Sequence, residues 1–157
     1  LSVRVGAALL ERKSMLACAE SCTGGWVSEA VTATAGSSEW FERGFVTYAN
    51  AAKVGMLGVR PETLEKHGAV SLEAAAEMAA GALSNSRALI SLAITGIAGP
   101  TGGSSDKPVG TVCFGWCLKG ETPSCERRLF AGDREAIRRQ SVIHALSGLI
   151  ATARNMP

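Results

Sequence analysis

The chain has few aromatic residues, no long hydrophobic run and almost no excess of charge. Aromatic residues make up 5% of its 157 residues, which argues against a β-sandwich, whereas 18 glycines and a hydrophobic share of 46% fit short buried strands packed against alanine-rich helices. With a net charge of +2, the chain lacks the basic surface that general nucleic-acid binding requires. No apolar run reaches the roughly 20 residues of a membrane span, and no signal-peptide pattern opens the chain. We therefore expect no nucleic-acid partner and no membrane partner.

Cysteine and histidine do not occur in patterns that build disulfides or bind metals. The five cysteines are odd in number and scattered through apolar segments, which argues against a disulfide framework. Cys113 and Cys117 are separated by three residues, and neither His67 nor His144 lies at the spacing of a zinc site. No Ser-His-Asp arrangement can be argued from these histidines. We expect buried thiols, a reducing cytoplasmic location and no metal site.

The hydrophobic pattern predicts helices that alternate with strands before a final hairpin. The expected strands are 15–20, 43–49, 88–95, 109–118 and 126–130. The expected helices are 2–13, 23–34, 51–57, 72–83 and 134–154, with a short helical turn at 61–68. Asn50, Ser71 and Asp133 are the expected N-caps. This order predicts one domain, residues 1–157, with the α/β class and a three-layer α/β/α arrangement around a mixed β-sheet.

The segment Ala19-Glu20-Ser21-Cys22-Thr23-Gly24-Gly25 follows a buried strand and leads into a helix. It places a hydroxyl and a thiol where free backbone N–H groups can stabilise an anion. Two interpretations stay open from the residues alone. Either Ser21 or Thr23 is only an N-cap and the glycines only turn the chain, or Ser21 is a nucleophile or the loop holds a phosphate. Cys22 is a rival nucleophile, which ranks lower because no histidine lies near it in the sequence.

Polar residues follow three of the predicted strands, and ligands of such sheets bind beyond the carboxyl ends of strands. They are Ser21, then Tyr48 and Asn50, then Thr95–Gly96. Several of them also have a purely structural interpretation: the Tyr48 ring packs on the core, Asn50 is a helix cap, and Thr95 is the last residue of its strand. Lys53 lies one turn into an apolar helix, where a lowered pKa would let it act as the base for Ser21, as in Ser–Lys hydrolases. The alternative is a solvated lysine.

The segment 96–108 is a long glycine-rich loop, and such loops inside compact domains are often functional. It matches neither the P-loop nor the dinucleotide-binding pattern, yet its N–H groups could hold a phosphate. Arg134, in the first turn of the last helix, is well placed for an anion, and Arg138 follows one turn later. A solvated basic face is the alternative.

Taken together, these segments resemble the CinA C-terminal domain family. The resemblance rests on blocks in family order over nearly the whole chain: 19–25, 36–38, 44–53, 57–59, 67–71, 95–100, 107–112 and 132–134. It implies a three-layer α/β domain, often dimeric, whose stand-alone members hydrolyse the carboxamide of nicotinamide mononucleotide to nicotinate mononucleotide and ammonia, in pyridine nucleotide salvage and without a cofactor. One departure is visible: many members carry Tyr-Ser-Asn-Glu-Ala-Lys where this chain has Tyr48-Ala49-Asn50-Ala51-Ala52-Lys53.

The resemblance also implies roles for individual residues. The family's serine, lysine and tyrosine fall on Ser21, Lys53 and Tyr48, which are the predicted catalytic residues. Its sheet-end hydroxyl falls on Thr95, and its substrate-site arginine on Arg134 or Arg138. The predicted substrate-binding set is Cys22, Thr23, Gly24, Asn50, Thr95, Gly96, Gly99, Arg134 and Arg138.

Two other functions compete with this amidase. The domain could be a non-catalytic nucleotide-binding or regulatory module of a CinA-type competence- or damage-inducible protein, or an amidase for another pyridine carboxamide. Ser21 and Lys53 together favour an enzyme, because a pure binding module needs neither.

Overall fold

The helices and strands follow the predicted order along the chain. The computed structural model describes residues 1–156. Its elements are α1 (Ser2–Glu11), β1 (Leu16–Glu20), α2 (Trp26–Thr32), η1 (Ser37–Glu39), β2 (Phe41–Val46), α3 (Asn50–Leu57), α4 (Pro61–His67), α5 (Leu72–Ser84), β3 (Ile90–Gly96), β4 (Thr111–Leu118), β5 (Ser124–Leu129) and α6 (Arg134–Arg154). None of the helices within this range is long and apolar enough to cross a membrane.

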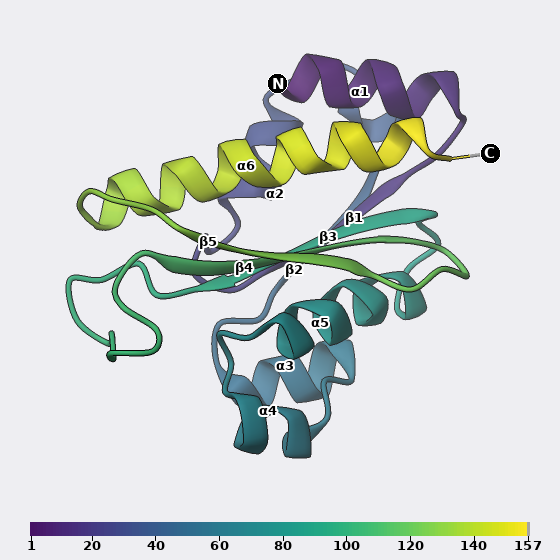
Figure 1. Cartoon of the computed structure of the whole chain (residues 1–157). Helices are drawn as coiled ribbons and strands as arrows, with labels where there is room; N and C mark the ends of the chain where they lie inside the picture. Colours follow the sequence, from purple (N-terminus) through teal and green to yellow (C-terminus); the bar gives the residue numbers. More distant parts are fainter. Residues whose placement is uncertain (157) are drawn as a thin grey trace.

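The strands form one mixed sheet in the order β2-β1-β3-β4-β5. β1 is parallel to β2 and β3, whereas β4 is antiparallel to β3 and to β5. Figure 1 shows α1, α2 and α6 on one face of the sheet and α3, α4 and α5 on the other. The predicted three-layer α/β/α fold with a mixed sheet is therefore confirmed.

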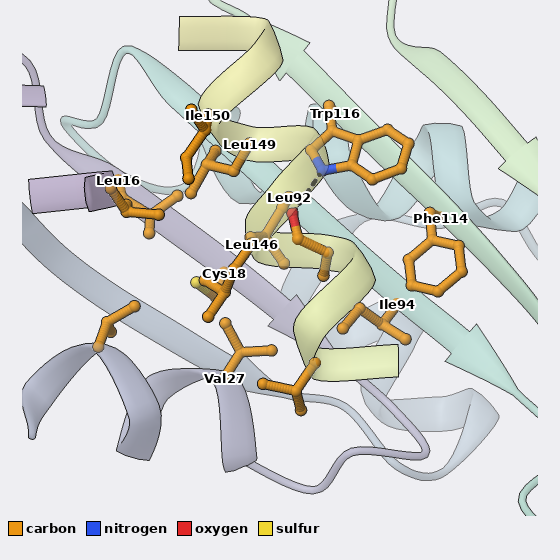
Figure 2. Packing of buried hydrophobic residues seen from close by; sticks show 14 of the residues in the cluster. Leu16, Cys18, Val27, Leu92, Ile94, Phe114, Trp116, Leu146, Leu149 and Ile150 are labelled. Atoms are coloured by element: carbon orange, nitrogen blue, oxygen red, sulfur yellow. Dashed lines mark hydrogen bonds between the residues drawn. The ribbon is translucent and has the colours of Figure 1, made fainter. Parts of the chain in front are cut away.

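Alternation along the strands divides the core between the two faces of the sheet. In β1, Leu16 and Cys18 pack towards α2 and α6, where large apolar side chains of β3, β4 and α6 surround them (Figure 2). Ala17 and Ala19 point to the opposite face, and their small side chains belong to the cluster that includes Met78 and Ala79 of α5. Because successive side chains alternate in a strand, one fully apolar segment serves both layers.

Several predicted boundaries were wrong near the strand ends. The helix expected at 23–34 begins at Trp26, because Gly24 and Gly25 have positive φ angles of 59° and 99° and cannot be helical. The strand expected at 43–49 ends at Val46. The predicted Asn50 cap is also wrong: Ala49 is the N-cap of α3, and Asn50 is the first helical residue.

Two of the three predicted N-caps are confirmed. The Ser71 hydroxyl accepts a hydrogen bond from the Ala74 N–H at 3.1 Å at the start of α5. The Asp133 carboxylate accepts one from the Ala136 N–H at 2.8 Å at the start of α6. Each side chain satisfies a donor that would otherwise lack a partner in the first helical turn. The Asp133 cap fixes where α6 begins, and thereby where its first arginine lies.

Candidate active site

The carboxyl ends of the parallel strands β1, β2 and β3 meet at one edge of the sheet, and a cavity of about 280 Å³ opens there. Its volume is close to the lower limit of about 300 Å³ that is usual for small-molecule sites. The lining residues come from the three strand ends, α3, the α4–α5 connection, the 96–103 loop and α6: Ser21, Cys22, Tyr48, Asn50, Lys53, Ala69, Val70, Thr95, Gly96, Ile97, Ala98, Gly99, Thr101, Gly102 and Arg134.

Lys53 and Ser21 are joined in this cavity although they lie 32 residues apart in the sequence. The Lys53 Nζ is 2.9 Å from the Ser21 Oγ. It also donates to the carbonyl oxygens of Thr47, at 2.9 Å, and Tyr48, at 3.0 Å. The Lys53 side chain is only 1% exposed, and burial lowers its pKa below the usual value.

The contacts of this amine are compatible with its neutral form, which burial favours. A neutral amine has two N–H bonds and one lone pair, and two carbonyl oxygens can only accept. If the N–H groups point at Thr47 and Tyr48, the lone pair faces the third neighbour, the Ser21 hydroxyl. Ser21 can then donate its proton to Lys53, which is the arrangement of a nucleophile and its general base.

The carboxylate of Glu20 holds the turn that carries Ser21. It is fully buried and accepts hydrogen bonds from the Thr23 hydroxyl at 2.6 Å and from the N–H groups of Gly25, Val27 and Ser28 at 2.9–3.2 Å. The Ser28 hydroxyl donates a fifth bond at 2.9 Å. A carboxylate in this position accepts hydrogen bonds from free N–H groups at the start of α2, and its negative charge interacts favourably with the positive end of the helix dipole. Sequence reasoning assigned no role to this residue.

The two arginines of α6 have different surroundings. Arg134 lines the cavity, where its Nη1 donates to the Gly99 carbonyl at 2.7 Å and its Nη2 to the Tyr48 hydroxyl at 3.2 Å. Arg138 does not line the cavity. Its guanidinium donates to the carbonyl oxygens of Cys22, at 3.0 Å, and Thr23, at 3.1 Å.

Of the remaining predicted residues, some line the cavity and others do not. Tyr48 is 61% exposed and lies at the cavity with Asn50. The Thr95 hydroxyl donates to the Ala69 carbonyl at 2.7 Å beside the cavity. Thr23 is fully buried with its hydroxyl bound to Glu20, and neither Thr23 nor Gly24 is among the lining residues.

Cys22 lies in the cavity wall but has the wrong ionisation state for a nucleophile at neutral pH. It is 5% exposed, and burial raises the pKa of its thiol to about 12. The thiolate is the reactive form of cysteine, and at pH 7 it would be almost absent. Ser21, with an amine at hydrogen-bond distance, is the better placed of the two. Among residues 1–156 no group of three or more potential metal ligands was found.

Comparisons with known proteins identify the family of the chain. The profile of the CinA C-terminal domain matches residues 1–153. The chain is 54% identical to nicotinamide-nucleotide amidohydrolase PncC of Escherichia coli K12 over 95% of this chain and 90% of that protein. It is 49% identical to the protein of the same name from Pseudomonas putida, over 96% of this chain and 93% of the other. The crystal structure of the competence/damage inducible protein CihA from Agrobacterium tumefaciens superposes with a TM-score of 0.93 at 46% identity, over 96% of this chain and 92% of that one.

Proposed function

The chain belongs to the CinA C-terminal domain family, and from that premise we propose that it is an amidohydrolase that converts nicotinamide mononucleotide to nicotinate mononucleotide and ammonia. The observation that carries the proposal is the buried Lys53 amine, 2.9 Å from the Ser21 hydroxyl in a cavity. Two relatives that are 54% and 49% identical to this chain are named nicotinamide-nucleotide amidohydrolase, and these names support the choice of substrate.

The reaction begins with Ser21 as nucleophile and Lys53 as base. Neutral Lys53 accepts the hydroxyl proton as Oγ bonds to the carboxamide carbon, whose electrophilicity is raised by the cationic pyridinium ring. The tetrahedral intermediate collapses when its C–N bond breaks and the nitrogen takes the proton from Lys53, so that ammonia leaves and an ester to Ser21 remains. Lys53 then takes a proton from a water molecule whose oxygen attacks the ester carbon, and it returns that proton to the Ser21 Oγ as the C–O bond breaks, which releases nicotinate mononucleotide and restores both residues.

Negative charge on the carboxamide oxygen requires hydrogen-bond donors beside Ser21. The backbone N–H group of Cys22, a residue that lines the cavity, directly follows the nucleophile and donates to no backbone carbonyl within residues 1–156. The next N–H group belongs to Thr23, which is fully buried and does not line the cavity. A donor that is fixed before the reaction stabilises an oxyanion better than mobile water does. We assign the Cys22 N–H to the oxyanion hole.

The rest of the cavity would hold the nucleotide. The Arg134 guanidinium, with its free N–H groups, and the N–H groups of the loop around Gly99 would bind the ribose phosphate. Tyr48, which supplies both a carbonyl to Lys53 and a hydroxyl to Arg134, would link the base to the phosphate end of the cavity. None of these steps calls for a metal or organic cofactor.

The wider setting of the reaction is part of the same proposal. Residues 1–157 would act as one catalytic domain, paired with a second copy in a homodimer, in the cytoplasm. The product would enter pyridine nucleotide salvage. The resemblance to the family is the support for these assignments.

Ammonia release from nicotinamide mononucleotide tests the function directly. The parent protein should turn the substrate over, and Ser21→Ala and Lys53→Met should lose at least about 10³-fold in kcat while staying folded. Retained activity in Ser21→Ala would remove the serine from the mechanism and direct attention to a directly attacking water. A parent that binds the nucleotide without releasing ammonia would favour the regulatory binding module instead.

A further inference from the structure

Arg138 contacts the active-site turn from outside the cavity. It lies on α6, and its guanidinium carbon is 5.2 Å from the centroid of the Trp26 ring, a cation–π arrangement that restrains the group. Its Nε donates to the Cys22 carbonyl and its Nη2 to the Thr23 carbonyl, at 3.0 and 3.1 Å. One rigid planar group therefore holds two successive carbonyl groups of the turn.

This contact restrains the backbone that directly follows the nucleophile. Each peptide unit is planar, so a guanidinium that binds the Cys22 and Thr23 oxygens fixes the planes of two successive peptide units. Cys22 lines the cavity, and its N–H group belongs to the peptide unit that joins it to Ser21. With its carbonyl bound by Arg138, the backbone of Cys22 is held beside the cavity.

We propose that Arg138 is a positioning residue, which acts on the reaction through the backbone of Cys22 without touching the substrate. The inference rests on the proposed function, in which the Cys22 N–H stabilises the oxyanion. It separates the two arginines of α6: Arg134 lines the cavity and acts on substrate binding, whereas Arg138 acts on the transition state.

Steady-state kinetics distinguish these roles. Loss of an interaction made only in the transition state lowers kcat, whereas loss of phosphate binding raises KM. We expect Arg138→Ala and Arg138→Lys each to lower kcat about 100-fold, the cost of losing one oxyanion donor, with KM changed less than about 3-fold. The lysine variant keeps the charge but cannot bind both carbonyls in one plane, so it should not restore kcat. Arg134→Ala should raise KM instead, and Arg139→Ala, exposed on the same helix, should change neither constant.

A second measurement works without the nucleotide. A fluorophosphonate that labels Ser21 places a phosphonyl oxygen in the oxyanion hole, so its labelling rate, followed by mass spectrometry, reports on the same donors. Both Arg138 variants should label about 10-fold or more slowly than the parent, whereas Arg134→Ala and Arg139→Ala should label at the parental rate. Unfolding curves in urea identify any variant that is slow only because it is unfolded.

The outcomes separate this proposal from the proposed function. Labelling of folded Arg138 variants at the parental rate, or a raised KM with unchanged kcat, overturns the positioning role. Normal labelling of the parent without ammonia release overturns the proposed substrate, and the labelling rates of the Arg138 variants then decide the positioning role alone.

Discussion

Glu20 offers a test of how the active-site turn is held that does not depend on any substrate. Its Oε2 accepts hydrogen bonds from the Thr23 hydroxyl and the N–H groups of Gly25 and Val27, and its Oε1 from the N–H and hydroxyl of Ser28. The substitution Glu20→Gln keeps the shape of the side chain. It removes the charge, however, and replaces one accepting oxygen with an amide NH₂ that can only donate.

The cost follows from these five bonds. If the glutamine oxygen stays with Thr23, Gly25 and Val27, its NH₂ group faces Ser28, whose hydroxyl can rotate to accept but whose backbone N–H cannot. A buried donor without a partner costs about 1–3 kcal/mol, and each of the three remaining bonds loses the roughly 1 kcal/mol by which a charged acceptor exceeds a neutral one. We therefore expect the free energy of unfolding to fall by about 4–6 kcal/mol, at or slightly above the roughly 3–5 kcal/mol that is lost when one partner of a buried ion pair is removed.

Urea unfolding of the parent and the variant measures this difference. Ser28→Ala is the matched control, because it removes one hydroxyl donor from the same carboxylate and should cost about 0.5–1.5 kcal/mol. A Glu20→Gln protein within about 1 kcal/mol of the parent would refute the argument, since the turn would then not depend on a buried negative charge.

Three further predictions concern the base, the rival nucleophile and the packing of helical glycines. Because burial lowers the pKa of Lys53 and the base must be neutral, kcat/KM should rise with pH through that lowered pKa and level off below the usual value of 10.5; a flat profile would contradict this role. The free energy of unfolding should rise with pH between that lowered pKa and 10.5, since only the unfolded chain still binds the proton there. Cys22→Ala should keep kcat within about 10-fold, because a thiol with a pKa of about 12 is not the nucleophile, and loss comparable to Ser21→Ala would reverse the assignment. Gly148→Ala should destabilise the protein by about 1–3 kcal/mol, since its Cβ would lie 2.3 Å from a buried indole ring, whereas Gly55→Ala, with open space at its Cβ, should stabilise by up to about 1 kcal/mol; equal unfolding midpoints would contradict both.

The fold could be predicted because its strongest signals are local. Apolar strands of five to eight residues, separated by amphipathic helices, specify the layers, and side-chain caps such as Ser71 and Asp133 mark helix starts. The boundaries that were wrong lie where long-range contacts decide the backbone. Helix α2 begins late because Gly24 and Gly25 have positive φ angles, in a turn that the buried Glu20 carboxylate holds by binding the N–H groups of Val27 and Ser28. A propensity argument sees Glu20 only as a charged residue at the end of a strand.

The site could be predicted only as far as the ends of the parallel strands could be aligned. That argument placed Ser21, Tyr48 and Thr95 around one cavity, as the structure does. It could not separate Arg134 from Arg138, because both lie in the first two turns of α6. Which one enters the cavity depends on how the helix crosses the turn after β1, and this crossing is a property of the packed layers.

The proposed base depends on tertiary structure, as the two carbonyl oxygens that bind the Lys53 amine show. A lysine one turn into an apolar helix is usually charged and extends its amine to water. Here the Lys53 amine is enclosed by the carbonyls of Thr47 and Tyr48, in the connection between β2 and α3, and by the hydroxyl of Ser21 after β1. Two neutral acceptors cannot compensate a buried positive charge as a carboxylate would, so burial favours the amine over the ammonium. An acidic residue in place of either carbonyl contact would hold the proton on Lys53 and remove its capacity to accept one from Ser21.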